Sequence, residues 1–483
     1  MSDSKKDFNY YFKHFFIIGS GSFISILIGL ITTPIVTRIV DTDSYGQLAI
    51  FNVFVNIGLF VFLLGLDQSL IRFYYEKKNS EHKRTIIRFC WLLPSIIVVL
   101  LLLFTIFAYV INIISKSLMP YVTMVLIGIF SQILYRISLL IIRLEKKSKL
   151  YALISITYKL IYLILVLIFA KIYKNNYFYA LVFSTLLSAF ISAFIGIICK
   201  IDLWNPFFKG NEKLNHKELL KYGAPFIISS GIHIFYNAVD KLSIKLFFSY
   251  SDVGIYASAV TIIGIFNIIQ TTFNSLWYPM AMEHYTNDKN DTLFYSKCCR
   301  IITVIMFVFG TTVIVFKDLI VLMLGSQYRS CVFIIPFLAF EPILYTISES
   351  TVRGIDFAKK SKYHVYISGI TLVTNFVLNI ILLKIFGIIG AAIATAISYI
   401  LFFVLRTTIS AKLFKVDYDF KRIMTLILFT FIFAILNAIK VPIIINICAY
   451  IIIQLIIFIL YKETILFLFD NLKKLVFKRK GEI

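Results

Sequence analysis

The feature that most limits how this chain can fold is a series of fourteen apolar segments, which take up most of its 483 residues. Each is about 20 residues long, the length at which an α-helix crosses the hydrocarbon core of a bilayer. They predict an all-α polytopic membrane protein with fourteen transmembrane helices. We place these helices at residues 15–37, 46–66, 89–113, 118–142, 151–171, 177–199, 222–244, 253–276, 300–323, 330–352, 364–384, 388–406, 423–439 and 441–461.

The positive charges are distributed unevenly between the loops. If the N-terminus is cytoplasmic, the inward loops and the two tails carry 36 of the 48 Lys and Arg, and the outward loops carry nine. Cytoplasmic loops are enriched in these residues, so the pattern predicts that both termini lie inside. Membrane orientation thereby accounts for the net charge of +23, and no loop is long enough to form a basic nucleic-acid-binding domain. We expect no nucleic-acid partner.

Two motifs recur, which indicates an internal repeat. Gly46 in Asp-Ser-Tyr-Gly-Gln-Leu aligns with Gly254 in Ser-Asp-Val-Gly-Ile-Tyr, and Lys-Lys-Ser-Lys at 146–149 recurs at 359–362. Each copy then contains six helices, so both copies enter the membrane in the same orientation, as parallel repeats about an axis along the membrane normal. We predict two six-helix lobes in a parallel pseudo-two-fold repeat plus a C-terminal helix hairpin, with domains at 1–221, 222–410 and 411–483.

Polar residues inside the apolar segments mark candidate sites, because lipid tolerates them poorly. Several share a helical face, and together they describe a hydrated cavity of amides, aromatic hydroxyls and a few charges. Such a cavity suits an anionic ligand that carries sugars. The predicted substrate-binding residues are Arg136, Lys159, Lys241, Asn237, Asn267, Gln270, Asn274 and Tyr345, and the predicted ion-coupling residues are Glu341 and Asp240.

Each charged candidate also has a plainer interpretation. Arg136 and Lys159 could extend to the cytoplasmic interface. Glu341 lies too deep for that, and it could form a structural ion pair with Lys159 or Arg136. Asp240 and Lys241 could form a local salt bridge or an exposed loop contact in the outer third of the membrane.

The sequence contains no convincing metal cluster, nucleophile triad or phosphate-binding Gly-Lys-Ser/Thr loop. We therefore expect no catalytic residues, no bound metal and no cofactor. We expect any energy for transport to come either from an ion gradient, with H⁺ or Na⁺ as the coupling ion, or from the substrate gradient. A membrane-embedded enzyme, such as a polysaccharide polymerase or ligase, would need more room for polar chemistry outside the membrane than the short outward loops provide.

Two further segments have local predictions. Pro336 and Pro342 lie in one apolar segment and predict that it bends. The basic tail at 462–483 is expected to form an interfacial helix on anionic membrane lipids.

The residues that carry a family resemblance are spread along the chain. They are the first 76 residues, Gly254-Ile255-Tyr256, Gly325-Ser326-Gln327-Tyr328, the run from Asn379 to Gly390 and the Ala-rich helix after it. In these segments the chain resembles the polysaccharide flippases of the multidrug/oligosaccharidyl-lipid/polysaccharide exporter superfamily. The resemblance covers nearly the whole chain.

The resemblance implies alternating-access transfer of undecaprenyl-pyrophosphate-linked oligosaccharide repeat units from the cytoplasmic to the outer leaflet of a bacterial inner membrane. The products would be O-antigen, capsule or exopolysaccharide, and the polysaccharide polymerase machinery would be a partner. The family's cationic cavity would be represented by Arg136, Lys159 and Lys241, with Glu341 and Asp240 opposing them. A flippase for lipid-linked peptidoglycan precursors, which also has fourteen spans, and an ion-coupled drug exporter, which usually has twelve, are the alternatives within the superfamily.

Overall fold

The computed structural model describes residues 28–77, 79–204, 215–439 and 441–480, and in these ranges it contains helices and connecting turns but no strand. Ten of the helices are long and apolar enough to cross a membrane, or up to twelve if two bent pairs each count as one span. The chain is therefore an all-helical, multi-pass membrane protein. The first predicted span, 15–37, lies largely outside the described ranges, and its described end belongs to the helix Ile28–Ile39.

Contacts divide the chain into two compact units, residues 1–257 and 258–483. This boundary differs from the one at 221/222 that the repeat predicts, because contacts assign each helix to its packing neighbours whereas the repeat follows sequence equivalence. The predicted lobes stay a prediction. The helices of the first unit are α2 (Thr42–Leu63), α3 (Leu66–Phe73), α4 (Ser80–Val110), α5 (Met119–Leu144), α6 (Ser148–Ile172), α7 (Tyr177–Ile198), α8 (Ile201–Trp204), α9 (His216–Phe247) and the first turns of α10 (Tyr250–Ile263).

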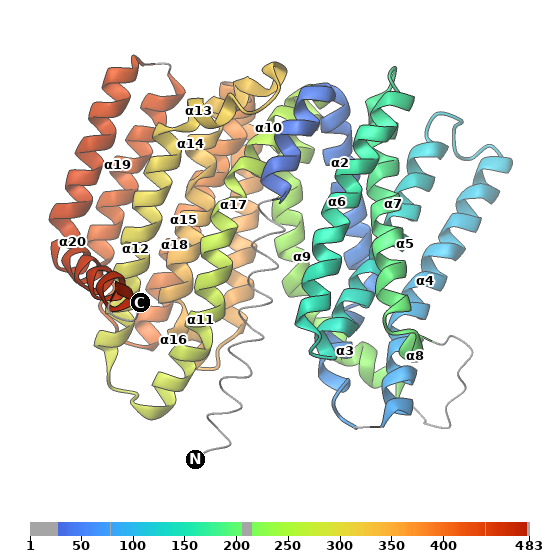
Figure 1. The fold of residues 1–483 in the computed structure, drawn as a ribbon, viewed down its shortest axis with the longest axis horizontal. Coiled ribbons are helices and arrows are strands. Elements are labelled where there is room, and N and C mark those ends of the chain that lie inside the picture. The colour runs from blue at the N-terminus through green and yellow to red at the C-terminus, as the bar shows by residue number, and fades with distance from the viewer. Residues whose placement is uncertain (1–27, 78, 205–214, 440, 481–483) are drawn as a thin grey trace. The chain divides into compact units, whose positions relative to one another are not determined.

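In the first unit α5 packs between α4 and α7, and α6 packs on α7 (Figure 1). α9 packs against α2 and α3. The interior is aliphatic and aromatic, with side chains such as Leu66, Tyr74 and Ile133 completely buried. The outer faces of α4 and α6 expose large apolar side chains, including Phe104 and Ile164, as expected for surfaces in contact with lipid.

The second unit contains two elements that are bent rather than straight. α10 and α11 meet at an angle of 47°, and the 3₁₀ helix η1 meets the following helical segment at 56°. The second bend is in the segment that contains Pro336 and Pro342, as predicted. The elements of this unit are α11 (Phe266–Asn287), α12 (Thr292–Val315), α13 (Lys317–Val321), η1 (Ser326–Phe333), α14 (Ile335–Leu338), α15 (Phe340–Thr351), α16 (Arg353–Phe357), α17 (Lys362–Phe386), α18 (Ile388–Leu413), α19 (Phe420–Ala438) and α20 (Ile443–Lys480).

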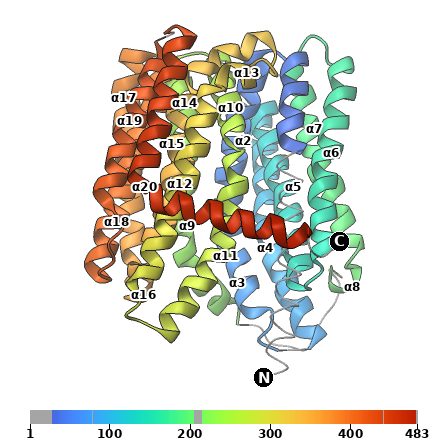
Figure 2. The same cartoon turned by 60° about the vertical axis from the view of Figure 1, so that its left-hand side comes forward.

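The C-terminal helices α19 and α20 pack against each other and against α12. Thr312 and Thr311 of α12 form hydrogen bonds with Tyr450 (3.1 Å) and Gln454 (2.9 Å) of α20. α20 has a non-helical residue at Tyr461, after which the chain runs across the direction of the hairpin (Figure 2). This turn begins where the interfacial tail is predicted, but the side chains from 471 onward lie outside the described part.

The internal repeat is visible in backbone geometry. Lys146 and Lys359, which are equivalent in the recurring motif, are both left-handed, with φ of 56° and 55°. Each follows a helix end closed by the same pattern, in which the next N–H reaches back five residues: Lys147 to Ile142 at 3.1 Å and Lys360 to Ile355 at 3.1 Å. A repeated motif without glycine therefore adopts a cap that normally favours glycine.

This cap predicts a stabilising substitution. A side chain in the left-handed region costs roughly 1 kcal/mol relative to glycine. Lys146→Gly is expected to raise the melting temperature of the purified protein by about 2 °C. Lys149→Gly, at an exposed residue in the first turn of α6, is the control and should give no increase, because glycine is unfavourable inside a helix. An equal rise in melting temperature in both variants would contradict a left-handed backbone at Lys146.

A second repeat feature is a close contact between the first turns of α2 and α10. A Cβ atom at Gly46 would lie 1.7 Å from the carbonyl oxygen of Tyr250, and one at Gly254 would lie 2.1 Å from that of Thr42. The same shift of 208 residues relates Thr42 to Tyr250 and Gly46 to Gly254. The contact is therefore reciprocal, as a local pseudo-two-fold axis requires. The hydroxyls of Thr42 and Ser251 complete it at 2.6 Å.

The N-terminal caps of these two helices use the same two residue types, an aspartate and a serine, in opposite order along the chain. Asp41 caps α2 by accepting from the N–H of Ser44 at 2.8 Å, and it also accepts from the Ser44 hydroxyl at 2.9 Å. Before α10 the order is reversed, and the Asp252 N–H donates to the Ser249 hydroxyl oxygen at 3.2 Å while the Ser249 N–H donates to the Asp252 carboxylate at 3.1 Å. Both arrangements satisfy N–H groups that a helix start otherwise leaves unpaired.

Candidate functional site

The candidate site is a cavity of about 390 Å³ that lies within the first unit. Its walls come from α2, α3, α5 and α9, and they combine amides and charges with apolar side chains. It includes three of the predicted binding residues, Arg136, Asn237 and Lys241. The lining residues are Asn52, Val53, Asn56, Leu59, Phe60, Leu63, Gly65, Asp67, Gln68, Arg136, Phe226, Ile234, Asn237, Ala238 and Lys241.

A break in the second apolar segment positions one end of the cavity. α2 ends at Leu63, and Leu64 and Gly65 both have left-handed backbones, with φ of 54° and 68°. α3 then begins at Leu66, and Asp67 and Gln68 in its first turn lie in the cavity wall. The hydropathy pattern does not reveal this break, because Leu64 and Leu66 continue the apolar run.

The break also packs directly on α9. A Cβ atom at Gly65 would lie 2.3 Å from the carbonyl oxygen of Gly223, and one at Gly223 would lie 2.8 Å from that of Gly65. Next to this crossing the Ser69 hydroxyl, completely buried, donates to the Leu219 carbonyl oxygen at 2.6 Å. Phe73 packs edge-on against Tyr222. α3 thus closes this end of the cavity, which we call the Gly65 end.

The main charged contact at the Gly65 end joins Arg136 of α5 to Asp67 of α3. Arg136 Nη2 donates to Asp67 Oδ2 at 2.6 Å. The Asp67 side chain is 9% exposed, whereas the Arg136 side chain is 52% exposed. A guanidinium group carries five N–H donors, so Arg136 retains donors that can face the cavity. Within the first unit the carboxylate partner of Arg136 is thus Asp67, and the predicted pairing of Arg136 with Glu341 stays a prediction.

Beyond the Gly65 end the cavity is lined by Asn237 and Lys241 of α9 and by Asn52 and Asn56 of α2. Each pair is spaced four residues apart, so each presents two polar groups on one helical face. Along α9 the lining residues extend from Phe226 to Lys241, fifteen positions that correspond to roughly 22 Å of helix rise. The cavity is therefore elongated, with a cation near each end and amides between them. We call the part of the cavity near Lys241 the Lys241 end.

Two other predicted residues of the first unit lie elsewhere. Lys159 of α6 is not among the residues that line the cavity, so the structure does not bring it together with Arg136 in this site. Asp240 is buried and accepts a hydrogen bond from the Tyr256 hydroxyl at 2.6 Å, and it does not line the cavity.

The remaining predicted residues belong to the second unit. Asn267, Gln270 and Asn274 are spaced along α11 at three- and four-residue intervals, and the Asn274 side-chain oxygen is buried. Glu341, on the first turn of α15, accepts a hydrogen bond from the Tyr399 hydroxyl at 3.1 Å. Tyr345, one turn further, stacks on Phe402 of α18 at 6.0 Å between ring centres.

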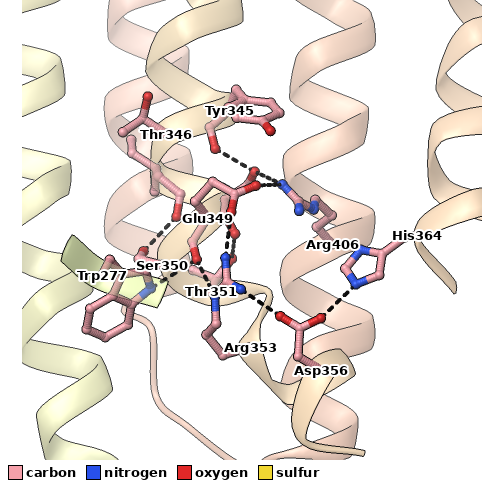
Figure 3. A network of polar contacts seen from close by, with 12 residues as sticks. Trp277, Tyr345, Thr346, Glu349, Ser350, Thr351, Arg353, Asp356, His364 and Arg406 are labelled. Atoms are coloured by element: carbon pink, nitrogen blue, oxygen red, sulfur yellow. Dashed lines mark hydrogen bonds and ion pairs between the residues drawn. The ribbon is translucent and has the colours of Figure 1, made fainter. Parts of the chain in front are cut away.

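One turn beyond Tyr345, Glu349 is the centre of a buried ionic network (Figure 3). It accepts from Arg353 at 2.5 Å and from Arg406 at 2.8 Å, and its backbone carbonyl accepts from Trp277 Nε1 at 3.1 Å. Arg353 also donates to Asp356 at 2.7 Å.

Asp356 extends this network to His364 at 3.0 Å. Although burial favours the neutral carboxyl, His364 and Arg353 lower the pKa of Asp356 below its usual value. Two arginines thus balance two carboxylates, and the network connects α15, α16, α17 and α18. We interpret it as a structural brace, since broken buried pairs leave uncompensated charges.

The first unit has a corresponding ionic cluster where α5 ends. Glu145 accepts from Lys83 at 2.9 Å, from Lys200 at 2.8 Å and from the Tyr74 hydroxyl at 2.6 Å. Partial burial alone would raise the pKa of Glu145, but the hydrogen bonds from Lys200, Tyr74 and Lys83 outweigh it and lower this pKa to about 2.

A lowered pKa in the folded state gives a pH-dependent stability. The Glu145 contribution is complete above the ordinary pKa of 4.5 and is lost as the pH falls from there toward 2. Glu145→Gln is expected to cost about 2 kcal/mol at pH 7, and its melting temperature should converge with that of the native protein as the pH approaches 2. Glu76→Gln, at an exposed carboxylate, is the control. A constant difference at every pH would contradict the assignment.

No group of three or more His, Cys, Asp and Glu side chains in the described ranges is arranged to hold a metal ion. The groups that the cavity offers are a guanidinium, an ammonium, amides and one carboxylate. They can bind an anion with hydroxyl-rich substituents, since charge-assisted hydrogen bonds hold the anion and amides pair with hydroxyls.

The fold is shared with solved membrane transporters. The lipid II flippase MurJ in an inward closed conformation matches with a TM-score of 0.68 at 17% identity, covering 93% of this chain and 100% of that chain. An inward-facing multidrug resistance transporter of the MATE family, from the MOP superfamily, matches with a TM-score of 0.58 at 12% identity, covering 80% and 95%. At these identities the likeness concerns the fold alone.

The sequence gives the family. The chain belongs to the polysaccharide biosynthesis protein family, whose profile matches residues 35–333. A relative from Haloferax volcanii, described as the probable low-salt glycan biosynthesis flippase Agl15, is 26% identical over 226 residues. That alignment spans 46% of this chain and 46% of the relative. The predicted resemblance to polysaccharide flippases of this superfamily is confirmed.

Proposed function

We propose that this protein flips a lipid-linked glycan precursor with a phosphate-bearing head across a membrane. The observation that supports the proposal best is the elongated cavity, with Arg136 near one end, Lys241 near the other and amides between. A phosphate group binds guanidinium and ammonium groups strongly, while the sugars can pair with Asn52, Asn56 and Asn237. The apolar carrier chain can stay in lipid.

The charge pattern of the loops supports an orientation for this path. With both termini in the cytoplasm, α2 runs inward and α9 runs outward, so the Gly65 end of the cavity faces the cytoplasm and the Lys241 end faces outward. The head group would then meet Arg136 first and Lys241 later. We propose undecaprenyl-pyrophosphate-linked oligosaccharide as the substrate, a bacterial inner membrane as the location and alternating access as the mechanism.

Transport by purified protein tests this proposal. The full chain is reconstituted in vesicles that contain a fluorescent undecaprenyl-pyrophosphate-linked oligosaccharide, and transfer is read from its accessibility to an external quencher. Transfer faster than in protein-free vesicles is expected. A lipid-linked peptidoglycan precursor in a parallel experiment distinguishes the two glycan classes. Equal rates with and without protein for both lipids would refute the proposal.

Coupling is a further part of the proposal. Glu341 is a partly buried carboxylate in a membrane-spanning segment, where an ionised group is costly unless it is paired, hydrated or protonated. We expect Glu341, together with Asp240, to exchange a proton or Na⁺ during transport. Glu341→Gln should remove the response of transfer to an imposed pH or Na⁺ gradient while slow transfer without a gradient persists. A mutant that kept both responses would show that the carboxylate has only a packing role.

A further inference from the structure

Asp67 is the one carboxylate that lines the described cavity, and its position suggests a role beyond charge balance. It is nearly buried, it holds Arg136 at 2.6 Å, and Gln68 adds a weaker contact at 3.3 Å. It also lies in the first turn of α3, directly after the Leu64–Gly65 break. One residue thus connects the exposed guanidinium of the cavity to the helix that closes it.

We propose that Asp67 is a positioning residue that competes with the ligand's phosphate for Arg136, so that binding releases α3 from α9. This inference rests on the proposed function. Carboxylates and phosphates bind the same planar donor edge of a guanidinium group. When a phosphate takes the Nη2 edge of Arg136 that Asp67 otherwise uses, Asp67 is left buried without its cation, which is unfavourable.

Movement of α3 relieves that cost. α3 is held to α9 by the Gly65–Gly223 crossing, by the hydrogen bond from Ser69 to Leu219 and by the Phe73–Tyr222 ring contact. The residues before it, Leu64 and Gly65, already form a break that separates it from α2. A shift at this break hydrates Asp67 and opens the Gly65 end of the cavity without moving α2.

The coupling must act in both directions. If ligand binding weakens the hold of Asp67 on Arg136, then Asp67 weakens ligand binding by the same factor. Asp67→Asn is therefore expected to tighten binding of a diphosphate, by roughly 5- to 100-fold for a typical coupling between sites. It should also slow transport, because release of α3 no longer depends on the ligand. If Asp67 only oriented Arg136, Asp67→Asn would instead weaken binding of the diphosphate.

The test measures binding of farnesyl diphosphate to the purified full chain, with farnesol as the control for binding of the tail alone. Asp43→Asn, an identical substitution at an exposed position on α2, should leave the affinity unchanged. Tighter binding by Asp67→Asn supports the inference. Unchanged or weaker binding by this variant overturns it. If the native protein does not bind farnesyl diphosphate more tightly than farnesol, the proposed function fails as well.

A second measurement reports the movement directly. Leu219 is 1% exposed and lies against α3, and its carbonyl oxygen is preserved in Leu219→Cys. In a background where the six native cysteines are replaced by Ala, a maleimide should label this cysteine slowly without ligand and faster with farnesyl diphosphate. Adding Asp67→Asn should give the faster rate without ligand. If neither farnesyl diphosphate nor Asp67→Asn changed the labelling rate, the release of α3 would be excluded.

Discussion

Arg136→Gln is expected to reduce transfer of the lipid-linked glycan by about 100-fold, since it removes charge-assisted hydrogen bonds worth about 3 kcal/mol to the phosphate. It also leaves Asp67, 9% exposed, without a cation, which is expected to lower the stability by roughly 1–3 kcal/mol, the usual penalty for a buried polar group that loses its partner. A loss of transport in this variant alone would therefore have two explanations.

The double variant Arg136→Gln, Asp67→Asn separates them. It removes both charges, so it should recover most of the melting temperature that the single variant loses, and it should still fail to transport. Arg136→Lys keeps the charge but loses the planar donor edge, and intermediate transport is expected. Normal transport in the double variant would remove Arg136 from the mechanism.

Gly46→Ala is expected to be strongly destabilising, by about 3 kcal/mol or more, because its Cβ would overlap the backbone of Tyr250. A backbone atom cannot change rotamer, so α2 and α10 would have to separate. Gly254→Ala should have a similar effect, since the contact is reciprocal. The measurement is thermal unfolding of purified protein.

The matched control is Gly369→Ala on α17, where nothing lies within 4 Å of the added Cβ. Alanine favours a helix over glycine by about 1 kcal/mol, so this variant should be as stable as the native protein or slightly more stable. Equal melting temperatures for Gly46→Ala and Gly369→Ala would mean that the close contact of α2 and α10 does not exist in the folded protein.

The sequence predicts the helical architecture well because hydropathy over 20 residues reports directly on burial in a membrane. The same reasoning identifies Arg136, Asn237 and Lys241 as candidate cavity residues, since polar groups inside apolar segments need partners or water. Asn52 and Asn56 also line the cavity but are not among the residues predicted from the sequence, although their spacing indicates a shared polar face. Their spacing of four residues in an apolar run places both amides on one face of a helix.

Other parts of the site cannot be read from the sequence. The break after α2 depends on two left-handed residues, one of them Leu64, which has the side chain of an ordinary helix residue. Because the predicted helix ends at residue 66, the sequence places Asp67 in a loop, whereas in the structure Asp67 lines the cavity. The partner of Arg136 is likewise a matter of three-dimensional packing, and a search for a buried carboxylate elsewhere in the sequence leads to Glu341 instead.

The exchanged caps of α2 and α10 restrict how the two halves of the gene can recombine. Asp41 with Ser44 and Ser249 with Asp252 are each complete pairs of one carboxylate and one hydroxyl. A crossover between the two copies that fell inside the four-residue cap would create one helix start with two serines and another with two aspartates. The first lacks the carboxylate that favours a helix N-terminus, and the second sets two like charges together. The two cap segments can thus both start a helix while their sequences are not interchangeable at this point.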